Sequence, residues 1–372
     1  MKPVDQSLAP TGISSTPRSV LIVGPVPPPY GGMAVQARAL ERQLRTDGIS
    51  TELMPTNPKL PFFFARIKGV RSVIQTTVFT YNLVRALRRA TVVHLLGASF
   101  WYFFLRVVPT VLLARLFRCE VILNYRGGEA PVFFARYYWL VRPVIRLAQF
   151  VAVPSAYLER LFKEYGFHPQ IIPNFVDLEQ FRFTPRQTVK PHLLVARGLE
   201  PLYNIKMALE SFRLVQKQYP DAHIDIIGGG SQEAELKRWV AAEGLNGVVF
   251  HGSIANEEMP KYLERADILL NPSNADNMPI NLLEAFACGI PIVSTRVGGI
   301  PDLVESEEAA LLVEPGDYKS MAAKVEELLS QPEKVKKLTE NAKSICDRYK
   351  WSSVRALWFK LYGVEANSYL VS

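Results

Sequence analysis

The sequence contains few cysteines and no closely spaced pair of them. Its three cysteines, Cys119, Cys288 and Cys346, lie far apart, and no C-x-x-C motif occurs. An odd number of scattered cysteines argues against a disulfide framework and gives no zinc-ligand spacing. We therefore expect a protein of a reducing compartment, with Cys288 packed in an apolar helix of the core.

Long apolar runs are missing as well. The most apolar region is Val92–Phe117, where the longest uncharged stretch after His94 is Leu95–Leu105, 11 residues. A membrane-spanning helix needs about 20 apolar residues, so no span is predicted. Met1–Thr16 has no apolar run after a basic start and is interpreted as a loose tail, not a secretory signal. His94 is expected to be a hydrogen-bonded residue at a strand end.

The overall composition excludes disordered and repetitive classes of protein. Of 372 residues, 48% are hydrophobic and 21% are charged, and the 22 glycines and 27 prolines follow no period. These are ordinary values for a globular chain. The length indicates two domains, or three at most.

Acidic residues are nearly absent from one part of the chain. Between positions 61 and 150 thirteen lysines and arginines face only Glu120 and Glu129, a local net charge of +11. The whole chain carries +8, so the remainder is −3. Many aromatic residues lie in the same window, including Phe62–Phe64, Phe100–Phe104 and Tyr137–Trp139. The basicity therefore belongs to one part of one domain.

This mixture of rings and arginines has two interpretations. It suits docking on an anionic bilayer, where rings lie at the depth of the headgroups and basic residues meet anionic lipids. Alternatively, the rings belong to the core and the arginines are solvated. A nucleic-acid interface is disfavoured, because no RNA-binding or zinc-finger motif accompanies the charge.

The pattern of apolar runs predicts strands that alternate with helices. Strands are expected at Ser19–Val23, Thr91–Leu96, Glu120–Tyr125, Phe150–Val153, His192–Arg197, His223–Ile227, Val248–His251, Ile268–Asn271, Ile292–Ser294 and Ala310–Val313. Helices are expected at Ala34–Arg45, Ile67–Arg89, Phe100–Arg118, Val132–Gln149, Ala156–Tyr165, Ile205–Gln218, Ser231–Glu243, Glu257–Arg265, Ile280–Cys288, Tyr318–Leu329 and Pro332–Tyr349. Alternation of this kind is typical of parallel α/β sheets.

We therefore predict two doubly wound, Rossmann-like α/β domains that face a cleft. Pro169–Pro185 is interpreted as the linker, because Pro, Asn and Phe interrupt the periodicity there. The predicted divisions are a flexible tail at 1–18, a first domain at 19–180, a second domain at 181–345 and a helical segment at 346–372. Ligands of such sheets bind at the carboxyl ends of the strands, so the site is expected in the cleft.

The strongest motif lies at Asn271–Val293, where an apolar strand leads through a polar loop into a helix. Asp276 and Glu284 are eight residues apart in it. Free N–H groups at a helix start bind phosphate, and a carboxylate one turn later can reach a pair of hydroxyl groups such as those of ribose. A phosphate is therefore expected at the backbone of Asn277, Met278, Pro279 and Ile280.

This stretch resembles the Glu-x7-Glu region of the retaining glycosyltransferases of family 4, which have the GT-B fold. Other segments follow in the family's order: Ile172–Asp177, Val195–Pro201, Ile227–Gly230, Phe250–Gly252 and Thr295–Asp302. The resemblance covers nearly the whole second half. In the first half it rests on Gly31-Gly32 and on Asn124–Glu129. It also implies that the C-terminal helix packs back on the first domain.

Three positions depart from the family's pattern. The first glutamate of the pair is Asp276, a carboxylate with a shorter reach. The lysine that usually follows the phosphate-binding arginine is missing, and either Tyr203 or Lys206 stands near its place. The first-domain histidine near the donor sugar is replaced by Arg126. Arg197 is therefore expected to be the main cation on the phosphates.

The resemblance implies transfer of a hexosyl group from a nucleotide diphosphate sugar with retention of configuration and without a metal ion or cofactor. Asp276, Arg197 and Arg126 are the implied catalytic residues. The implied donor-binding residues are Gly31, Gly32, Tyr203, Lys206, Gly229, Asn277, Met278, Pro279, Ile280 and Glu284. A UDP-sugar is expected before a GDP-sugar. Glycine turns such as Gly31-Gly32 and Gly228–Gly230 are also common as plain strand–helix connections.

The implied acceptor is lipid-linked or a glycan of a bacterial-type surface polysaccharide or glycolipid. A cytoplasmic protein that is peripheral on the inner face of the cell membrane fits that acceptor and the basic window. Two alternatives stay open at this point. One is a sugar-nucleotide 2-epimerase of the same fold, and the other is a non-catalytic partner of a membrane polysaccharide assembly complex.

Overall fold

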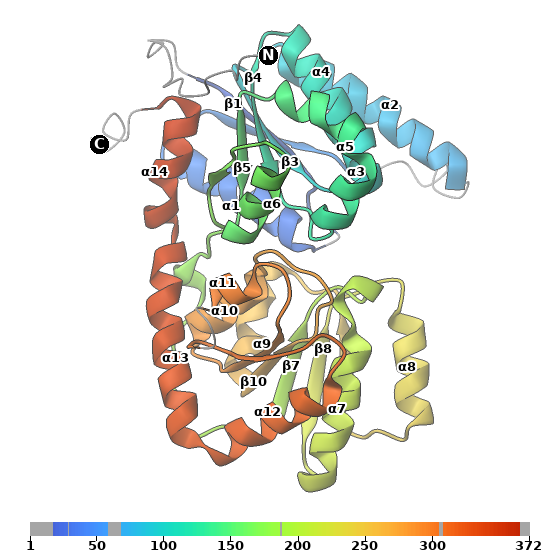
Figure 1. The fold of residues 1–372 in the computed structure, drawn as a ribbon, viewed down its shortest axis with the longest axis vertical. Helices are drawn as coiled ribbons and strands as arrows, with labels where there is room; N and C mark the ends of the chain where they lie inside the picture. Colours follow the sequence, from blue (N-terminus) through green and yellow to red (C-terminus); the bar gives the residue numbers. More distant parts are fainter. Residues whose placement is uncertain (1–17, 29, 59–67, 187, 305–307, 365–372) are drawn as a thin grey trace.

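The computed structural model describes residues 18–28, 30–58, 68–186, 188–304 and 308–364. Two six-stranded parallel sheets, one above the other in Figure 1, form the centres of the two halves. The predicted pair of doubly wound α/β units is therefore confirmed. We propose 19–180 and 181–345 as the domain boundaries, since each range contains one sheet. Most of the predicted tail lies outside the described residues.

The first sheet is built from short apolar runs, most of them rich in valine and isoleucine. Its strand order is β2-β1-β3-β4-β5-β6, and every neighbouring pair is parallel. The strands are β1 (Val20–Gly24), β2 (Thr51–Pro55), β3 (Val92–Gly97), β4 (Glu120–Tyr125), β5 (Phe150–Val153) and β6 (Gln170–Ile171). Central strands buried on both faces read as continuous apolar segments, and for this reason most of them were visible in the sequence.

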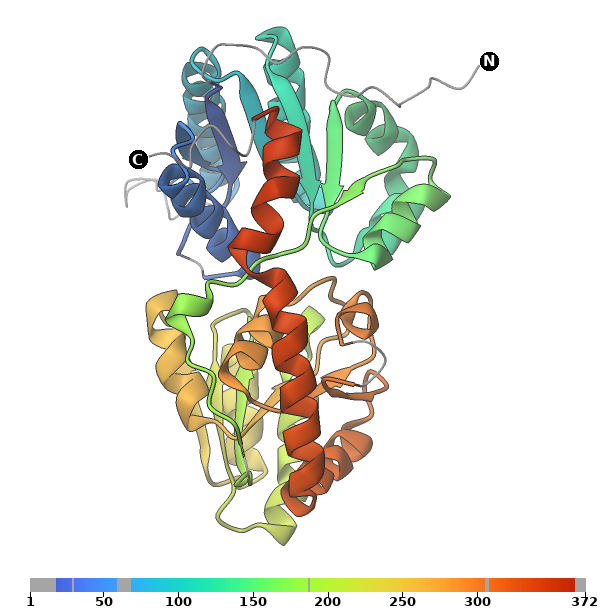
Figure 2. The ribbon, with the colours of Figure 1, turned by 90° about the vertical axis from the view of Figure 1, so that its left-hand side faces the viewer.

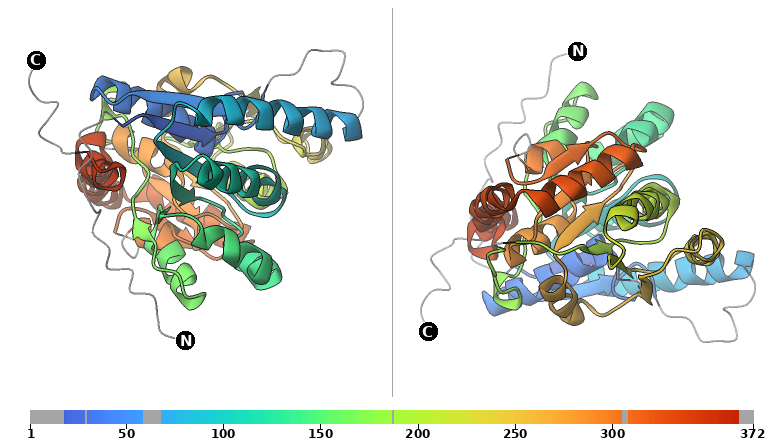
Figure 3. Two further views of the ribbon diagram at one scale, coloured as in Figure 1. Left: turned by 90° about the horizontal axis from the view of Figure 1, so that it is seen from above. Right: turned by 90° about the horizontal axis from the view of Figure 1, so that it is seen from below.

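Helices cover both faces of this sheet. On one face lie α1 (Gly32–Thr46) and α14 (Trp351–Tyr362), which share a buried cluster with Val20, Ile22 and Leu96. The other face carries α2 (Lys68–Leu87), α3 (Phe100–Tyr102), a π-helical turn η2 (Phe103–Val107), α4 (Val108–Leu116), α5 (Ala130–Arg146) and α6 (Ala156–Glu164). Seen from above in Figure 3, α14 is on the opposite side of the sheet from α2 and α5.

The second sheet repeats the same architecture with the order β12-β11-β10-β7-β8-β9. Its strands are β7 (His192–Ala196), β8 (His223–Ile227), β9 (Val248–Gly252), β10 (Ile268–Asn271), β11 (Ile292–Thr295) and β12 (Leu311–Val313). Its helices are α7 (Ile205–Gln218), α8 (Glu233–Ala242), α9 (Met259–Arg265), α10 (Ile280–Cys288), α11 (Ile300–Leu303), α12 (Tyr318–Ser330) and α13 (Pro332–Cys346). Cys288 is buried in α10, as expected.

The last two helices connect the halves. In Figure 2 α13 runs along the second half and α14 continues onto the first. Trp351 at the start of α14 donates a hydrogen bond from Nε1 to Asp47 at 2.7 Å, and Trp358 and Phe359 are buried against the first sheet. The expected packing of the C-terminal helix on the first domain is therefore confirmed. The last part of the predicted segment 346–372, from residue 365, lies outside the described residues.

The structure corrects the prediction in three places. β2 is an additional strand at the sheet edge. It was not predicted because its polar residues Thr51 and Glu52 interrupt the apolar pattern of a strand. β6 adds two residues inside the predicted linker, which also contains the short 3-10 helix η3 (Leu178–Gln180). The single helix predicted at Phe100–Arg118 is divided by the π-turn η2, and Phe100 itself has a φ of 55°.

Candidate functional site

A cavity of about 430 Å³ lies between the carboxyl ends of the two sheets. The first half contributes the loop between β1 and α1, including Gly31 and Gly32. The second half contributes residues that follow β7 and β8, among them Arg197 and Gly229, and the start of α10. The cavity therefore lies in the predicted place, and both halves line it.

The start of α1 opens directly into this cavity. Gly31 is its N-cap and has a φ of −106°, so the turn itself does not demand glycine. A Cβ on Gly31 would meet nothing within 4 Å, and one on Gly32 would lie 3.4 Å from Ile280 Cδ1. The two glycines keep the helix N-terminus uncovered. Its free N–H groups and positive dipole end make this a favourable place for an anion.

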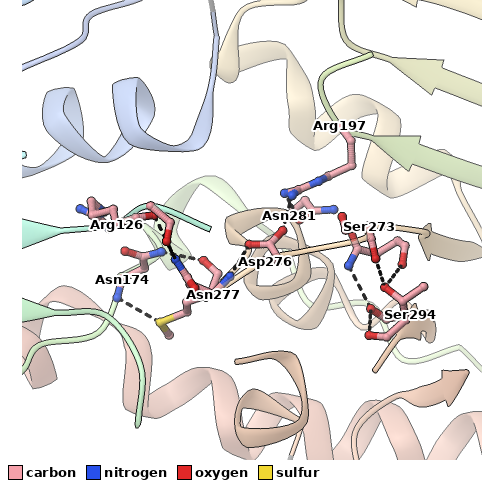
Figure 4. Close-up of polar contacts among 12 residues, drawn as sticks. Arg126, Asn174, Arg197, Ser273, Asp276, Asn277, Asn281 and Ser294 are labelled. Atoms are coloured by element: carbon pink, nitrogen blue, oxygen red, sulfur yellow. Dashed lines mark hydrogen bonds and ion pairs between the residues drawn. The ribbon is translucent and has the colours of Figure 1, made fainter. Parts of the chain in front are cut away.

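Arg197, directly after β7, carries the main positive charge of the cavity wall. Its guanidinium forms an ion pair with Asp276 and lies 3.3 Å from Asn281 Oδ1, as drawn in Figure 4. The ring of Tyr203 lies 4.1 Å from the guanidinium carbon. The Nε atom of Arg197 is buried, and within the described residues it has no hydrogen-bond partner. Arg197 therefore places a fixed cation in the wall of the cavity, where an anion can bind.

Asp276 is held by contacts within the second half of the molecule. Burial raises the pKa of its carboxyl, while Arg197 and the backbone N–H of Asn277, at 2.8 Å, act in the opposite direction. The loop that carries Asp276 rests on buried hydrogen bonds, among them Asn271 Nδ2 to Ser294 Oγ at 2.9 Å and Thr295 Oγ1 to the Ser273 carbonyl at 2.6 Å. A buried polar network of this kind fixes the loop.

Glu284 lines the cavity one turn inside α10, as the motif predicts. The side chain is buried, and burial raises the pKa of its carboxyl to about 8. Near pH 7 this carboxyl is therefore mostly protonated, so that it can both donate and accept a hydrogen bond. Asn281, one turn closer to the helix start, also lines the cavity. Together they present a polar edge inside an otherwise apolar helix.

The four residues expected at the phosphate lie in different environments in the structure. Ile280, the first residue of α10, lines the cavity. Asn277 instead joins the halves, because its side-chain amide donates to the carbonyls of Arg126 at 3.0 Å and Gly127 at 2.8 Å. The carbonyl of Met278 accepts a bond from Asn174 at 2.7 Å, and Pro279 is the N-cap of α10. Neither Met278 nor Pro279 is among the described residues that line the cavity.

The two residues considered in place of the family's lysine also lie in different environments. Tyr203 lines the cavity, with its ring against Arg197 and Gly198. Lys206 is exposed in the first turn of α7, with its ammonium 5.8 Å from the ring of Trp239, and is not among the described lining residues. In this structure Lys206 lies outside the cavity wall, because α7 directs it toward α8.

Gly229 lines the cavity, and its neighbours serve close packing. A Cβ on Gly228 would lie 1.9 Å from the Arg197 carbonyl, and one on Gly230 would lie 2.4 Å from the Leu199 carbonyl. Gly228 also has a φ of +137°. These glycines therefore allow the turn after β8 to approach the turn that carries Arg197. Gly230 fits the interpretation as a plain connection, whereas Gly228 combines this close packing with a place in the cavity wall.

Arg126 follows β4 on the first-half side of the contact between the halves. Burial lowers the pKa of its guanidinium to about 10. Figure 4 shows this guanidinium pointing away from Arg197 and Asp276, and Arg126 is not among the described lining residues. Its backbone carbonyl, by contrast, accepts the bond from Asn277. In this structure Arg126 contributes to the site through its main chain.

Some polar residues of the site were not singled out from the sequence. Glu200 lines the cavity and accepts a hydrogen bond from the Ser231 N–H at 2.9 Å. Asn281 comes three residues before Glu284, and this helical spacing places both on one face of α10. The spacing is the sequence pattern from which Asn281 could have been predicted as a site residue. Within the described residues, no group of His, Cys, Asp and Glu is arranged to hold a metal ion. The described part of the chain also contains no helix long and apolar enough to cross a bilayer.

Comparison with known proteins places both halves in one enzyme family. The model of glycosyl transferases group 1 matches residues 177–345, and the model of glycosyltransferase family 4 matches residues 30–180. A sulfoquinovosyl transferase of Arabidopsis thaliana is 24% identical over 95% of this chain and 76% of its own length. A phosphatidyl-myo-inositol mannosyltransferase of Propionibacterium freudenreichii is 27% identical over 72% of this chain and 70% of its own.

Solved structures agree on the fold. A sucrose-phosphate synthase of Thermosynechococcus elongatus matches with a TM-score of 0.74 at 18% identity, over 93% of this chain and 98% of that one. HepE of Anabaena, solved with UDP and glucose, matches with a TM-score of 0.71 at 16% identity, over 92% and 98%. With the two family models spanning both sheets, the chain belongs to the group 1 glycosyltransferases of family 4 and has the GT-B fold.

Proposed function

We propose that this glycosyltransferase transfers a hexosyl group with retention from a nucleotide diphosphate sugar, without a metal ion. The observation that carries the proposal is the cavity wall on which Arg197, Glu284 and the start of α1 converge. In the reaction the bond between the anomeric carbon and the diphosphate breaks, the acceptor hydroxyl oxygen bonds to that carbon, and the hydroxyl proton ends on the released diphosphate. Negative charge then develops on the leaving diphosphate. Positioned donors directed at developing charge are usually the largest contribution to catalysis.

The residues of the cavity divide this work. Arg197 and the N–H groups at the start of α1 receive the diphosphate. Glu284 receives the hydroxyl pair of the ribose. Asp276 keeps Arg197 in place until the diphosphate competes for it, and then lies beside the donor sugar. No further cofactor enters this scheme.

A UDP-sugar is the proposed donor, with a GDP-sugar as the next candidate. HepE, a structural neighbour with the same fold, was solved with UDP and glucose. The proposed acceptor is lipid-linked or a surface glycan, in keeping with the name of the phosphatidyl-myo-inositol mannosyltransferase among the relatives. We also propose that the protein works on the cytoplasmic side, at the inner face of the cell membrane, in cell-envelope polysaccharide synthesis. The basic window at 61–150 supports that location.

The test begins with a panel of nucleotide sugars and the purified full chain. A bound donor raises the melting temperature by mass action, and this identifies the nucleotide. The donor is then incubated with and without a membrane lipid extract, and nucleotide release and the sugar product are measured. Release that depends on the extract, with a product of retained configuration, supports the proposal. A free epimerised sugar nucleotide, or no turnover with any donor, would overturn it.

A further inference from the structure

Two neighbouring helical segments of the first half are apolar on their outer side as well as on the inner side. Along α3, η2 and α4 the positions 101, 105, 108, 112 and 116 recur every three or four residues, and all are Trp, Leu or Val. Trp101 is 77% exposed and Leu116 is 75% exposed. A helix on the surface of a soluble domain normally presents polar residues there. Exposed apolar stripes of this length indicate a surface with a partner.

The helix α5 repeats the pattern. Its inner side is buried in the core through Phe133, Phe134 and Val144. Its outer side shows Val132, Trp139 and Leu140, and Trp139 is 78% exposed. The helices α4 and α5 contact each other on the same face of the sheet, so their outer sides lie next to each other (Figures 1 and 3). We define the docking face as Trp101, Leu112, Leu116, Val132, Trp139 and Leu140.

Within the basic window, the charges around the docking face are almost entirely positive. Arg115, Arg118, Arg136 and Arg146 are exposed beside it. Of the two acidic residues of the basic window, Glu120 forms an ion pair with Arg18 at 2.8 Å, which leaves Glu129. Two copies of this face would bring like charges together at an apolar contact, which is unfavourable. An anionic lipid surface instead complements both the rings and the arginines.

The docking face begins at the mouth of the cleft. Trp101 comes four residues after the end of β3, and Val132 comes four residues after Gly128 in the loop that follows β4. That loop reaches the second half, because Gly127 accepts the hydrogen bond from Asn277. Leu116 and Leu140 lie further along their helices, away from the cleft. A surface that covers the face from end to end would therefore meet the cleft mouth.

We propose that the docking face inserts its rings into the headgroup region of an anionic bilayer and thereby places the cleft mouth at the membrane. This inference rests on the proposed function, since it explains how the sugar reaches a lipid-linked acceptor. The acceptor's reactive end enters the cleft while its hydrocarbon stays in the bilayer. The proposal also locates the membrane contact within the first half. Arg88 and Arg89 precede β3 and lie at the end of the domain away from the cleft, so they are not at the centre of this contact.

The experiment measures partition of the full chain between buffer and vesicles by sedimentation. The vesicles are pure phosphatidylcholine, or phosphatidylcholine partly replaced by phosphatidylglycerol. We expect binding to the anionic vesicles that weakens with salt. The double variant Trp101→Glu with Trp139→Glu should lower the partition coefficient by about tenfold or more, because interfacial binding scales with the apolar area buried.

A matched control substitutes exposed apolar residues outside the face, Val249→Glu with Leu357→Glu, and should leave the partition unchanged. Trp139 fluorescence should also be quenched by lipids with brominated acyl chains. Donor binding by thermal shift confirms that each variant is folded. Vesicle binding without sugar transfer would contradict the proposed function but would still support the docking face as a membrane contact. Equal partition of both double variants would overturn the inference. It would also be overturned if the wild type did not bind vesicles but formed a dimer, and if only the tryptophan double variant were monomeric.

Discussion

At the scale of single residues, the cavity wall contains one arginine where the family pattern has two cations. Arg197 is fixed on one side by Asp276 and on the other by the ring of Tyr203. Gly198 makes room for that ring, because a Cβ there would lie 3.3 Å from it. A ring under a guanidinium attracts the cation and limits its rotation. Tyr203 thus acts as a positioning residue for Arg197.

This role gives a prediction that separates the ring of Tyr203 from its hydroxyl group. Tyr203→Phe keeps the ring and should retain turnover within about threefold, whereas Tyr203→Leu should lower turnover by roughly tenfold, since a partly buried cation–π contact is worth about 1–2 kcal/mol. Steady-state kinetics with the identified donor measure both. A loss in Tyr203→Phe as large as in Tyr203→Leu would show that the hydroxyl contacts the diphosphate and that the ring is secondary.

Glu284 gives a prediction about pH. Its carboxyl has a pKa raised to about 8, so it must lose a proton to accept two hydroxyl hydrogen bonds as a carboxylate. Donor affinity should therefore rise with pH up to about 8, by at most about tenfold per unit. A sugar diphosphate ester has no group that titrates in this range, which keeps the measurement clean. Calorimetric titration from pH 6 to 9 measures the slope.

The comparison variant is Glu284→Gln, which should bind the donor more weakly and with no such slope. The same raised pKa acts on the free protein in the opposite direction. Between about pH 4.5 and 8 the unfolded state loses the proton that the folded state keeps, so this group makes the protein less stable as the pH rises. A wild-type affinity that is level across the range would contradict the role given to Glu284.

Single residues also show how far the sequence predicts positions in the fold, while the roles given to them stay predictions. Arg197 and Glu284 were found because they belong to an ordered set of motifs, and both line the cavity. Lys206 and Arg126 were proposed from their places along the chain alone. Their side chains point elsewhere, since the direction in which α7 starts and the packing around the turn after β4 decide that orientation. No spacing rule in the sequence contains this information.

At the scale of elements, the loop before α10 depends on polar residues beneath it. Asn271 and Ser294, at the ends of β10 and β11, are buried and bonded to each other at 2.9 Å. Ser273 in turn donates to Asn271 at 3.0 Å. Buried polar groups left without partners cost about 1–3 kcal/mol each. The position of Asp276 therefore rests on a network that contacts no substrate.

We predict that Asn271→Ala lowers the free energy of unfolding by about 2 kcal/mol, because it leaves the Ser294 and Ser273 hydroxyls short of partners. Turnover should also fall, as the loop that carries Asp276 loosens. Denaturant unfolding and kinetics measure the two effects. Asn246→Ala, in the turn before β9, serves as the control and should change neither. Loss of stability with unchanged turnover would show that the loop is held by other contacts.

Elements differ in how well the sequence predicts them. Central strands such as β3 and β4 are buried on both faces and read as mostly apolar runs. β2 is an edge strand with Glu52 and Pro55, so its pattern resembles a loop. The π-turn η2 has the composition of the helices around it, and only the packing of Phe103 and Val107 into the core distinguishes it. Edge strands and helix irregularities depend on tertiary contacts that a local pattern does not contain.

At the scale of the whole molecule, α14 joins the second half to the first through a buried polar contact. Tyr362, near the end of α14, and His94, in the middle of β3, lie 2.7 Å apart between the tyrosine oxygen and Nδ1. Asn124 of β4 bonds the other ring nitrogen at 3.1 Å, and Trp358 packs 4.5 Å from the imidazole centre. The hydrogen bonds expected for His94 are therefore present, but its expected place at a strand end was wrong, because His94 lies inside β3. Its partner on a helix 268 positions away was outside the reach of any local pattern.

This contact should make the stability of the folded protein, including the packing of α14 on the first half, decrease at acidic pH. Burial, with a smaller contribution from Arg126, lowers the pKa of His94 from 6.5 to about 3. The folded state keeps the imidazole neutral, whereas the unfolded state binds a proton below pH 6.5. Stability should therefore fall as the pH drops from about 6.5 toward 3, at up to about 1.4 kcal/mol per unit from this group.

The measurement is thermal unfolding as a function of pH in His94→Gln, compared with the wild type. The variant should be less stable at pH 7, because a bond to Tyr362 or Asn124 is lost, but its stability should depend less on pH between 6.5 and 4. His168→Gln is the matched control, since His168 is exposed in the turn after α6 and should keep the wild-type dependence. Parallel pH profiles for His94→Gln and the wild type would place the acid sensitivity elsewhere, and α14 would then be held by its apolar residues alone.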